Sequence, residues 1–261
     1  MHPPASLEST PAPALALPEF AGRVALVTGA SAGIGRATCE ALLENGARCL
    51  GLSRSGGGPA HPAFTAVRCE LGDAASIAAA MRQVRALAPA LDHVVNVAGT
   101  DPKIPLEQGG PERWDEIFDL NLRAYYLVIR ESLPSLRLGR GRSIVNVSSI
   151  NYRLGLPGRS IYSSTKAGIL GLTTGLAREL GRERIRINTV TPGWTFTERQ
   201  TSEYFDGESA AKHFAHLERV QALPLCIQSR DIANHILFYL SSHSRASTGH
   251  NCVVDGGWLL E

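Results

Sequence analysis

The stretch Val24-Ala-Leu-Val-Thr-Gly-Ala-Ser-Ala-Gly-Ile-Gly35 decides the fold of this 261-residue chain. It opens with a short apolar run typical of a buried strand, passes through a glycine-rich turn, and continues into a helical pattern that stops near Asn45-Gly46. Glycines in such a turn let the backbone approach a pyrophosphate, and the start of the helix offers free N–H groups. The spacing is G-x-x-x-G-x-G rather than G-x-G-x-x-G, and a plain tight turn is the alternative. The strand before the turn and the helix after it favour dinucleotide binding.

Six more strand patterns follow along the chain, and helical patterns separate them. The predicted strands cover residues 47–52, 64–68, 91–99 with the turn, 143–147, 184–190 and 252–255; the main helices cover 73–88, a long segment from 111, 159–180, and 231–241 with Ser229 as its cap. Alternating strands and helices predict an α/β fold in one doubly wound domain. We expect a seven-stranded, mainly parallel sheet flanked by helices.

Composition narrows the class of protein. The net charge is +2 and the basic residues are scattered, so we expect neither nucleic acid nor a membrane surface as partner. No run of eighteen apolar residues occurs. Residues 1–19 are rich in proline and lack a secretory pattern, which predicts a flexible extension before a domain over 20–261. Five cysteines without C-x-x-C spacing indicate reduced thiols and a cytoplasmic location, with Cys39 and Cys49 in the core.

The carboxyl ends of several predicted strands carry the polar and glycine-rich positions. In doubly wound sheets, ligands bind at this edge, so the glycine turn, Asn96 to Gly99, Ser148-Ser149 and Pro192-Gly193 should meet there. The second strand ends at Ser53-Arg54, where an NAD-binding protein would carry an acidic residue. Because an arginine can bind the 2′-phosphate of NADP(H), this cofactor is favoured, and NAD(H) stays possible. The alternative is a solvated arginine in a loose glycine loop.

Tyr162 and Lys166 are four residues apart within a predicted helix, so their side chains share one face. An ammonium favours ionisation of a neighbouring phenol, and such a pair can move a proton to or from a carbonyl or alcohol oxygen. The alternative for this spacing alone is an ordinary solvated helix face.

Taken together, these motifs resemble the short-chain dehydrogenase/reductase family over residues 20–258. The motifs are Thr28-Gly-x-x-x-Gly-Ile-Gly35, Asn96-Val-Ala-Gly99, Asn121, Ser149, Tyr162-x-x-x-Lys166 and Pro192-Gly-x-x-x-Thr197. The resemblance implies an NAD(P)-dependent oxidoreductase with a Rossmann fold, assembled as a homotetramer or homodimer, with no metal in the chemistry. A wide apolar face on the helix that begins at Pro111 also suggests an oligomer.

The resemblance also implies roles for single residues. Tyr162 would be the general acid/base, Lys166 would lower its pKa and hold the nicotinamide ribose, and Ser149 would bind the substrate oxygen. Asn121 would keep a helix distortion that links Lys166 to solvent. The implied cofactor residues are Gly29, Ser31, Gly33, Ile34, Gly35, Ser53, Arg54, Glu70, Leu71, Asn96, Ala98, Gly99, Tyr162, Lys166, Pro192, Gly193, Thr195 and Thr197. Two positions depart from the family pattern: Val97 replaces a second Asn, and Glu70 replaces an Asp near the adenine.

Three further segments resemble the family's bacterial aldose 1-dehydrogenase branch. They are Asn151-Tyr-Arg-Leu-Gly-Leu156, Thr191-Pro-Gly-Trp-Thr-Phe-Thr-Glu-Arg-Gln200, and Thr248-Gly-His250 with Asp255-Gly-Gly-Trp258. A sugar would need several hydrogen-bond partners, and the candidates besides Ser149 and Tyr162 are Asp101, Asn151, Arg159, Trp194 and Gln200; loop solvation or packing is the alternative for each. Residues 194–223 would form a substrate lid that carries His213 and His216, which lack a third metal ligand.

We therefore expect an NAD(P)-dependent enzyme that transfers a hydride between nicotinamide and a secondary alcohol or carbonyl, with a sugar as first candidate. An NADPH-dependent ketone or 3-oxoacyl reductase is the alternative within the same class. A non-catalytic dinucleotide-binding regulator is the alternative from another class, although a sensor would not require Ser149, Tyr162 and Lys166 together.

Overall fold

The structure, a computed structural model, describes residues 4, 6–10 and 12–260, and its described part confirms the α/β prediction. Seven strands among the described residues form one sheet in the order β3-β2-β1-β4-β5-β6-β7, and every neighbouring pair is parallel. The strands are β1 Val24–Thr28, β2 Arg48–Ser53, β3 Phe64–Arg68, β4 His93–Asn96, β5 Ser143–Val147, β6 Arg186–Pro192 and β7 Asn251–Val254. The order reverses at β1 and β4, which creates the crevice where such sheets bind ligands.

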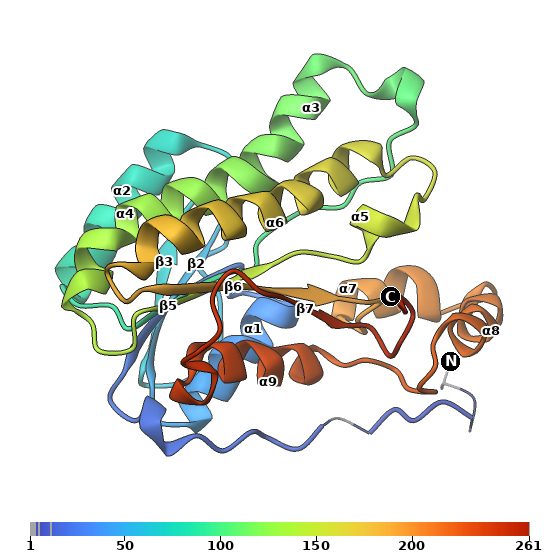
Figure 1. The fold of residues 1–261 in the computed structure, drawn as a ribbon. Helices are drawn as coiled ribbons and strands as arrows, with labels where there is room; N and C mark the ends of the chain where they lie inside the picture. Colours follow the sequence, from blue (N-terminus) through green and yellow to red (C-terminus); the bar gives the residue numbers. More distant parts are fainter. Residues whose placement is uncertain (1–3, 5, 11, 261) are drawn as a thin grey trace.

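Helices cover both faces of the sheet (Figure 1). The α-helices are α1 Gly33–Glu44, α2 Ala74–Leu87, α3 Pro111–Phe118, α4 Ala124–Leu138, α5 Asn151–Leu154, α6 Ser160–Gly181, α7 Glu198–Gln200, α8 Ala210–Val220 and α9 Ser229–Leu240. Alternating side chains of β1 divide the core: Leu26 joins the cluster under α2, α4 and α6, whereas Ala25 and Val27 join the one under α1 and α9.

Several predicted boundaries shift for local reasons. The sixth strand begins at Arg186 rather than Arg184, because Arg184 has a φ of 58° and belongs to the preceding turn. The last long helix begins at Ser229, and Gln228, not Ser229, is its cap, since Gln228 and Asp231 form a reciprocal capping box. Asp73, where the sequence predicted the helix over 73–88 to begin, caps α2 by accepting bonds from Ala75 N and Ser76 N.

Residues 194–223 contain more regular structure than the sequence predicted. The helix α7 continues into a π-helical turn over Thr201–Phe205 (η4), and α8 follows. Phe205, Phe214 and Leu217 are buried in a small cluster that is separate from the two main cores. In Figure 1, α7 and α8 lie beyond the carboxyl ends of the strands, where they can border a ligand site.

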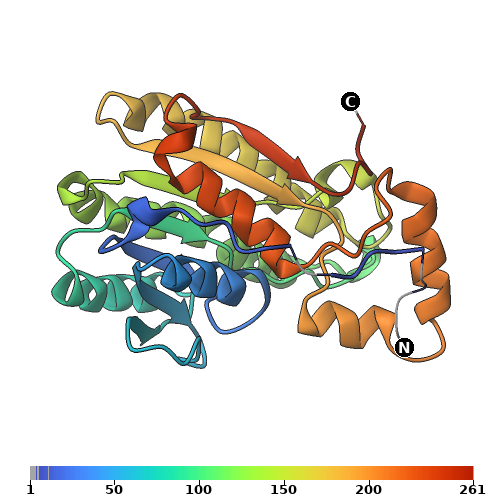
Figure 2. The ribbon, with the colours of Figure 1, turned by 90° about the horizontal axis from the view of Figure 1, so that it is seen from below.

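The N-terminal segment lies against the domain in its described residues. Leu7 is buried in the cluster under α8, and Glu8 exchanges backbone hydrogen bonds with Pro224 and Cys226 at 2.9 and 2.7 Å. Farther along, Asn45 and Asn234 bond the backbone of residues 13–17. Figure 2 shows this segment crossing the face that carries α9 toward α8. The described part of this segment therefore packs on the domain. The sequence predicted a flexible extension over residues 1–19, of which residues 1–3, 5 and 11 lie outside the described residues.

No helix in the described part of the chain is long and apolar enough to cross a membrane.

Candidate active site

The glycine turn between β1 and α1 is shaped for close approach of a ligand. Gly29 has a φ of 69°, and a Cβ there would lie 3.1 Å from the Ala98 backbone. A Cβ on Gly35 would lie 2.2 Å from Gly29 O, so neither position accepts a side chain. The residue before α1, Ala32, offers no side-chain cap to the first N–H groups of the helix. The turn therefore fits a pyrophosphate, with Gly29, Ser31, Gly33, Ile34 and Gly35 around it, as the resemblance implies.

A carboxylate from the predicted lid reaches this turn. Glu198, the first residue of α7, accepts a hydrogen bond from Gly33 N at 3.2 Å. Thr197 also lies close to Gly33, because a Cβ added to Gly33 would meet Thr197 Cγ2 at 3.1 Å. The sequence reasoning identified Thr197 but missed Glu198, whose spacing from the turn of more than 160 positions leaves no local signal.

The positions predicted for the adenosine end follow β2 and β3. Ser53 is buried and donates from Oγ to Gly57 O at 3.3 Å, so it supports the glycine loop. Arg54 beside it is exposed and can meet a 2′-phosphate. Glu70 is exposed and accepts from Gly72 N at 3.3 Å, whereas Leu71 is buried in the core. This edge thus offers an arginine, with the carboxylate of Glu70 turned back onto its own loop.

Asn96 ends β4, and Ala98 and Gly99 follow it in a loop that lies next to the glycine turn. Thr28 Oγ1 accepts bonds from Val97 N and Ala98 N at 3.0 and 3.2 Å, which clamps this loop to β1. Asn96 is buried and donates to Asn146 Oδ1 at 2.9 Å, and its own Oδ1 has no hydrogen-bond partner in the part of the chain that the structure describes. Of these predicted cofactor positions, Gly99 lines the central cavity.

The residues at the end of β6 and just after it form another wall of the cavity. A Cβ on Gly193 would lie 2.7 Å from Asp255 Cα, so only glycine fits at position 193 without a shift of the backbone. Thr195 is buried and donates to Gly193 O at 3.3 Å, and Thr197 caps α7 by accepting from Gln200 N at 3.2 Å. Pro192, Gly193, Thr195 and Thr197 all line the cavity.

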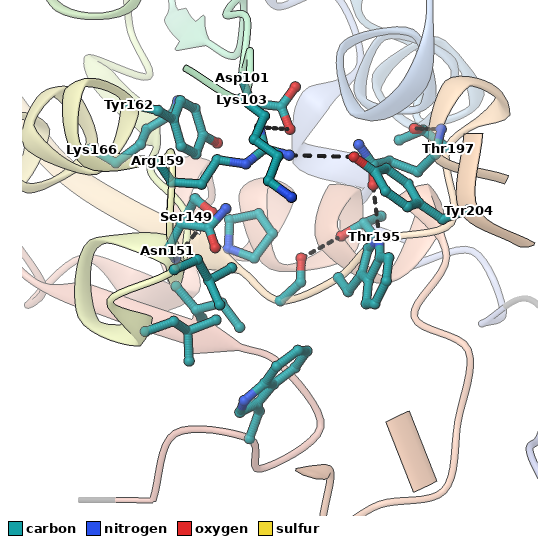
Figure 3. A pocket seen from close by; sticks show the side chains of 18 of the residues that line it. Asp101, Lys103, Ser149, Asn151, Arg159, Tyr162, Lys166, Thr195, Thr197 and Tyr204 are labelled. Carbon is teal, nitrogen blue, oxygen red and sulfur yellow. Dashed lines mark hydrogen bonds and ion pairs between the residues drawn. The ribbon is translucent and has the colours of Figure 1, made fainter. Parts of the chain in front are cut away.

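Ser149, Tyr162 and Lys166 meet at this cavity (Figure 3). Ser149 follows β5, and Tyr162 and Lys166 share one face of α6 as their spacing predicts. Lys166 is buried, and its Nζ donates to Val147 O at 3.0 Å and lies 5.7 Å from the centre of the Tyr162 ring. Tyr162 is half-buried, and its side chain lines the cavity. A hydroxyl, a phenol and an ammonium therefore converge where a substrate oxygen would sit.

Burial sets the proton affinities of this group. Desolvation raises the pKa of Tyr162 to about 12, while hydrogen bonding with Ser149 and the charges of Arg159 and Arg199 act to lower it. Desolvation also lowers the pKa of Lys166 to about 8, so its amino group binds a proton more weakly than an ordinary lysine does. The net pKa shift of Tyr162 in the protein is thus upward, because desolvation of the phenol outweighs the charges of Arg159 and Arg199; that Lys166 lowers the pKa of Tyr162 stays a prediction.

Asn121 occupies the distortion expected for it. Residues Asp119–Arg123 form a π-helical turn (η3) between α3 and α4, and Asn121 is fully buried within it. Its side chain accepts from Thr100 N at 2.9 Å and donates to Thr100 O at 2.8 Å. Its Oδ1 and Lys166 Nζ both border Gly99, since a Cβ there would lie 3.1 and 3.6 Å from them. Asn121 therefore ties the loop after β4 to the surroundings of Lys166.

The cavity has a volume of about 760 Å³, and all the predicted substrate residues line it. Asp101 forms ion pairs with Arg159, at 3.3 Å, and with Arg199. Trp194 donates from Nε1 to Gln200 Oε1 at 2.7 Å, so these two predicted residues bind each other. Sequence reasoning missed several other lining side chains: Lys103, Arg199, Tyr204, Lys212, Arg219 and Trp258.

The two histidines of the predicted lid each lie against another protein group. His213 Nδ1 lies 2.7 Å from Tyr204 O, and His216 Nδ1 lies 3.0 Å from Arg219 Nη2. Among the described residues, no group of three or more His, Cys, Asp or Glu side chains could hold a metal ion.

Comparisons with known proteins agree with this geometry. A family profile described as enoyl-(acyl carrier protein) reductase matches residues 29–259. A probable galactose dehydrogenase of Rhizobium meliloti is 33% identical over 94% of this chain and 98% of its own. A 3-oxoacyl-[acyl-carrier-protein] reductase of Vibrio harveyi is 34% identical over 92% of this chain and 98% of its own. The solved aldohexose dehydrogenase of Thermoplasma acidophilum superposes with a TM-score of 0.84 at 25% identity, covering 92% of this chain and 95% of that one.

Proposed function

The chain belongs to the short-chain dehydrogenase/reductase family, and from this premise we propose that it oxidises a hydroxyl group of a sugar or a sugar-derived alcohol with a nicotinamide cofactor. At the coarser level the protein is an oxidoreductase that acts on CH–OH or carbonyl groups. The observation that carries the proposal is the meeting of Ser149, Tyr162 and Lys166 at one cavity beside the glycine turn. The names of the relatives support a sugar and also keep a ketone or 3-oxoacyl substrate as the second candidate.

The mechanism follows from the chain's own side chains. Ser149 Oγ and the Tyr162 phenol would bind the reacting oxygen, and Tyr162 would take its proton during oxidation or return it during reduction. Lys166, held by Val147 O, supplies a positive charge that favours the phenolate as it forms. When bound, the nicotinamide supplies the hydride chemistry. Asn121 bonds Thr100 in the loop after β4, and both Asn121 and Lys166 border Gly99 of that loop, so Asn121 would position Lys166 without touching substrate.

We propose NADP(H) as the preferred cofactor. Arg54 is exposed directly after β2, and Ser53, where an acidic side chain would stand in an NAD-specific protein, is turned into its own loop. Arg54→Ala should raise the KM for NADP⁺ by about tenfold and leave the KM for NAD⁺ unchanged, because it removes one charged contact to a phosphate. Equal effects on both cofactors would contradict the assignment.

The assay of the function follows reduced cofactor by absorbance. The purified protein is tested with NAD⁺ and NADP⁺ against aldoses and polyols, and with NADH and NADPH against ketones and 3-oxoacyl thioesters. Tyr162→Phe should lower turnover by about 10²- to 10⁴-fold, the usual contribution of a general acid or base. Tyr152→Phe on α5, which lies outside the cavity lining, is the matched control and should keep full activity. Full turnover by Tyr162→Phe would refute the mechanism.

Two further features support an assembled, intracellular protein as part of the proposal. Trp114 and Tyr126, on α3 and α4, keep 44% and 48% of their surfaces exposed, which suits the homodimer or homotetramer expected for the family. The cytoplasmic location expected from the cysteine content stays a prediction.

A further inference from the structure

We propose that the substrate carries an anionic group, a carboxylate or a phosphate, which the basic side chains of the cavity bind beside Tyr162. The inference rests on the proposed function, because it names the class of compound whose oxygen reaches Tyr162. It narrows the sugar proposal to acidic derivatives and gives the missed basic residues a role.

The charge of the cavity differs from the charge of the chain. The whole chain has 26 basic and 24 acidic residues, which nearly balance. The cavity lining contains six basic side chains and a single acidic one, Asp101, among the described residues. One of the six, Lys166, belongs to the chemistry, and the others are Lys103, Arg159, Arg199, Lys212 and Arg219. A local excess of this size raises the concentration of anions in a cleft.

Hydrogen-bonding capacity points the same way. Each hydroxyl of a neutral sugar both donates and accepts, so a sugar also needs acceptors from the protein, whereas Lys and Arg only donate. Asp101, the one carboxylate, already pairs with Arg159 and Arg199, and the Gln200 carbonyl accepts from Trp194. The lining therefore has many more charged donors than charged acceptors, and its one carboxylate is already paired. The ligand that satisfies such a lining is one with several acceptor oxygens, as carboxylates and phosphates have.

Arg159 is the side chain most clearly placed for this role. Only 12% of its side chain is exposed, and its Nη1 is buried. That nitrogen lies 3.3 Å from Asp101 Oδ2 but lacks hydrogen-bond geometry to any described residue, so its donors are available. Its Nη2 donates to Tyr204 OH at 3.3 Å, which orients the guanidinium. A buried guanidinium with a free donor is costly unless a ligand completes it.

The geometry also puts this charge next to the reaction. Arg159 precedes Tyr162 by three residues at the start of α6, which places both on one face. Arg159, Lys103 and Tyr162 point into the same cavity (Figure 3). The charges of Asp101, Arg159 and Arg199 act on the pKa of Tyr162, which shows that the cluster and the phenol share one environment. An anionic group held here would lie near the oxygen that exchanges its proton with Tyr162.

The lid completes the basic wall from another part of the chain. Lys212 and Arg219 of α8 line the cavity, whereas Glu218 on the same helix bonds Ser6 of the N-terminal segment instead. The basic and acidic side chains of α8 are therefore sorted by face. Lys103 comes from the loop after β4 and Arg199 from α7, so separate segments converge on one ligand region.

The alternative is that these cations serve the cofactor's pyrophosphate. The pyrophosphate is expected at the start of α1, where the glycine turn presents backbone N–H groups. Arg159 instead lies with Ser149 and Tyr162 on the substrate side. The two readings differ in which KM responds to loss of Arg159.

The test compares matched pairs of substrates in the holoenzyme assay. The pairs are galactose against galacturonate and galactose 6-phosphate, and butane-1,3-diol against 3-hydroxybutyrate. We expect kcat/KM to be at least about tenfold higher for the anionic member of a pair, as one charged hydrogen bond provides. Added salt should reduce this preference, because screening weakens the attraction of a charged ligand. The two kinds of anion, carboxylate and phosphate, are ranked by the same measurement.

Arg159→Gln should cut the ratio of anionic to neutral kcat/KM by about tenfold or more through KM, and Arg159→Lys should restore part of it. Arg178→Gln, which removes an exposed arginine near the end of the same helix, is the control and should leave the ratio unchanged. An equal or higher kcat/KM for the neutral members would overturn the inference and leave the proposed function standing. A rise in the cofactor KM of Arg159→Gln, with the ratio unchanged, would also overturn it.

A binding measurement decides the inference without turnover. Malonate and inorganic phosphate, with glycerol as the neutral probe, are titrated calorimetrically into the protein with NADP⁺ present. Weaker binding of either anion by Arg159→Gln than by wild type supports the inference. Equal binding by the two proteins, or no binding of either anion, overturns it. If no alcohol or carbonyl is turned over at all, the proposed function fails, and this titration still gives a result for the anion site.

Discussion

Tyr162 can exchange a proton with a substrate only in the protonation state that the direction of reaction needs. Oxidation needs phenolate, and a phenol with a pKa of about 12 is almost entirely protonated near neutral pH. Each unit of pH should therefore raise kcat/KM for oxidation by about tenfold between pH 6 and 8. Above about pH 8, Lys166 loses its own proton, and with it the charge that favours phenolate, so the rise should flatten.

Reduction uses the protonated phenol, so its kcat/KM should stay nearly constant between pH 6 and 8. Rate profiles in both directions, measured with the same substrate pair, check this difference. An oxidation rate that does not change over this range would show that Tyr162 is not the group that accepts the proton.

A second residue, His93, should make the stability of the fold depend on pH. His93 is buried in β4, and desolvation lowers its pKa to about 3, with the charges of Arg23 and Arg186 acting in the same direction and Asp92 against it. Between pH 3 and 6.5, the unfolded chain binds a proton at this position and the folded chain does not. Stability is therefore lost as the pH falls from 6.5, by about 2 kcal/mol between pH 7 and 5.

Urea unfolding of wild type and His93→Gln at both pH values measures this effect. The variant should be less stable at pH 7, because His93 Nδ1 lies 2.8 Å from Ser143 Oγ and the ring is closely packed against Gly141. Its loss of stability between pH 7 and 5 should nevertheless be smaller than that of wild type by about 2 kcal/mol. A loss of the same size in both proteins would assign the acid sensitivity to other groups.

At the scale of elements, α7 places a negative charge, the carboxylate of Glu198, at the start of α1, where the pyrophosphate of the cofactor would also lie. Glu198 of α7 accepts from Gly33 N at the start of α1, where the positive end of the helix attracts anions. A pyrophosphate at this turn would compete with the carboxylate for the Gly33 N–H. Glu198→Gln should therefore lower the Kd of the cofactor by about two- to fivefold, which corresponds to the 0.3–1 kcal/mol typical of a charge at a helix end.

Fluorescence titration of NADP⁺ into both proteins gives these constants. Glu208→Gln removes an exposed carboxylate from the same segment without touching the glycine turn, and it should leave the Kd unchanged. If Glu198→Gln bound the cofactor more weakly, Glu198 would be a cofactor ligand rather than a competitor.

Elements differ in how much of them the sequence could predict. The strand β1, the glycine turn and the start of α1 are contiguous, so local pattern was enough, and the same holds for the Tyr162–Lys166 spacing on α6. The sequence did not predict helix α8. Its apolar residues pack in one cluster with Leu7 and Phe205, and this tertiary contact, which has no local pattern, stabilises the short helix. Lys103, Arg199 and Glu198 were missed for the same reason: their partners are brought near by the fold, not by spacing.

At the scale of the whole molecule, the N-terminal segment anchors the wall of the active site. Leu7 is 3% exposed within the cluster under α8, and Glu8 pairs with the chain just after that helix. Leu7→Ala should weaken this contact by about 2 kcal/mol or more, as core truncations do. We expect faster amide hydrogen exchange over residues 198–220 and a higher KM for substrate, with unchanged exchange in β1 and β4.

Leu15→Ala provides the matched control, because Leu15 lies in the same segment but packs on the core under α1 and α9. It should leave exchange in residues 198–220 as in wild type. Faster exchange throughout the domain in Leu7→Ala would mean that the segment supports the fold in general and not the wall in particular.

The packing of α1 on α9 joins elements from opposite ends of the chain. It therefore determines how long the apolar face of α1 stays exposed during translation. Leu42 of α1 and Ile236 of α9 belong to one buried cluster. A ribosome releases α1 early, but its apolar face stays without that cover until α9 has been synthesised. An incomplete chain that stops before Ser229 would expose this face to chaperones and proteases. Cells should therefore remove truncated products of this protein even when they contain the whole cofactor turn.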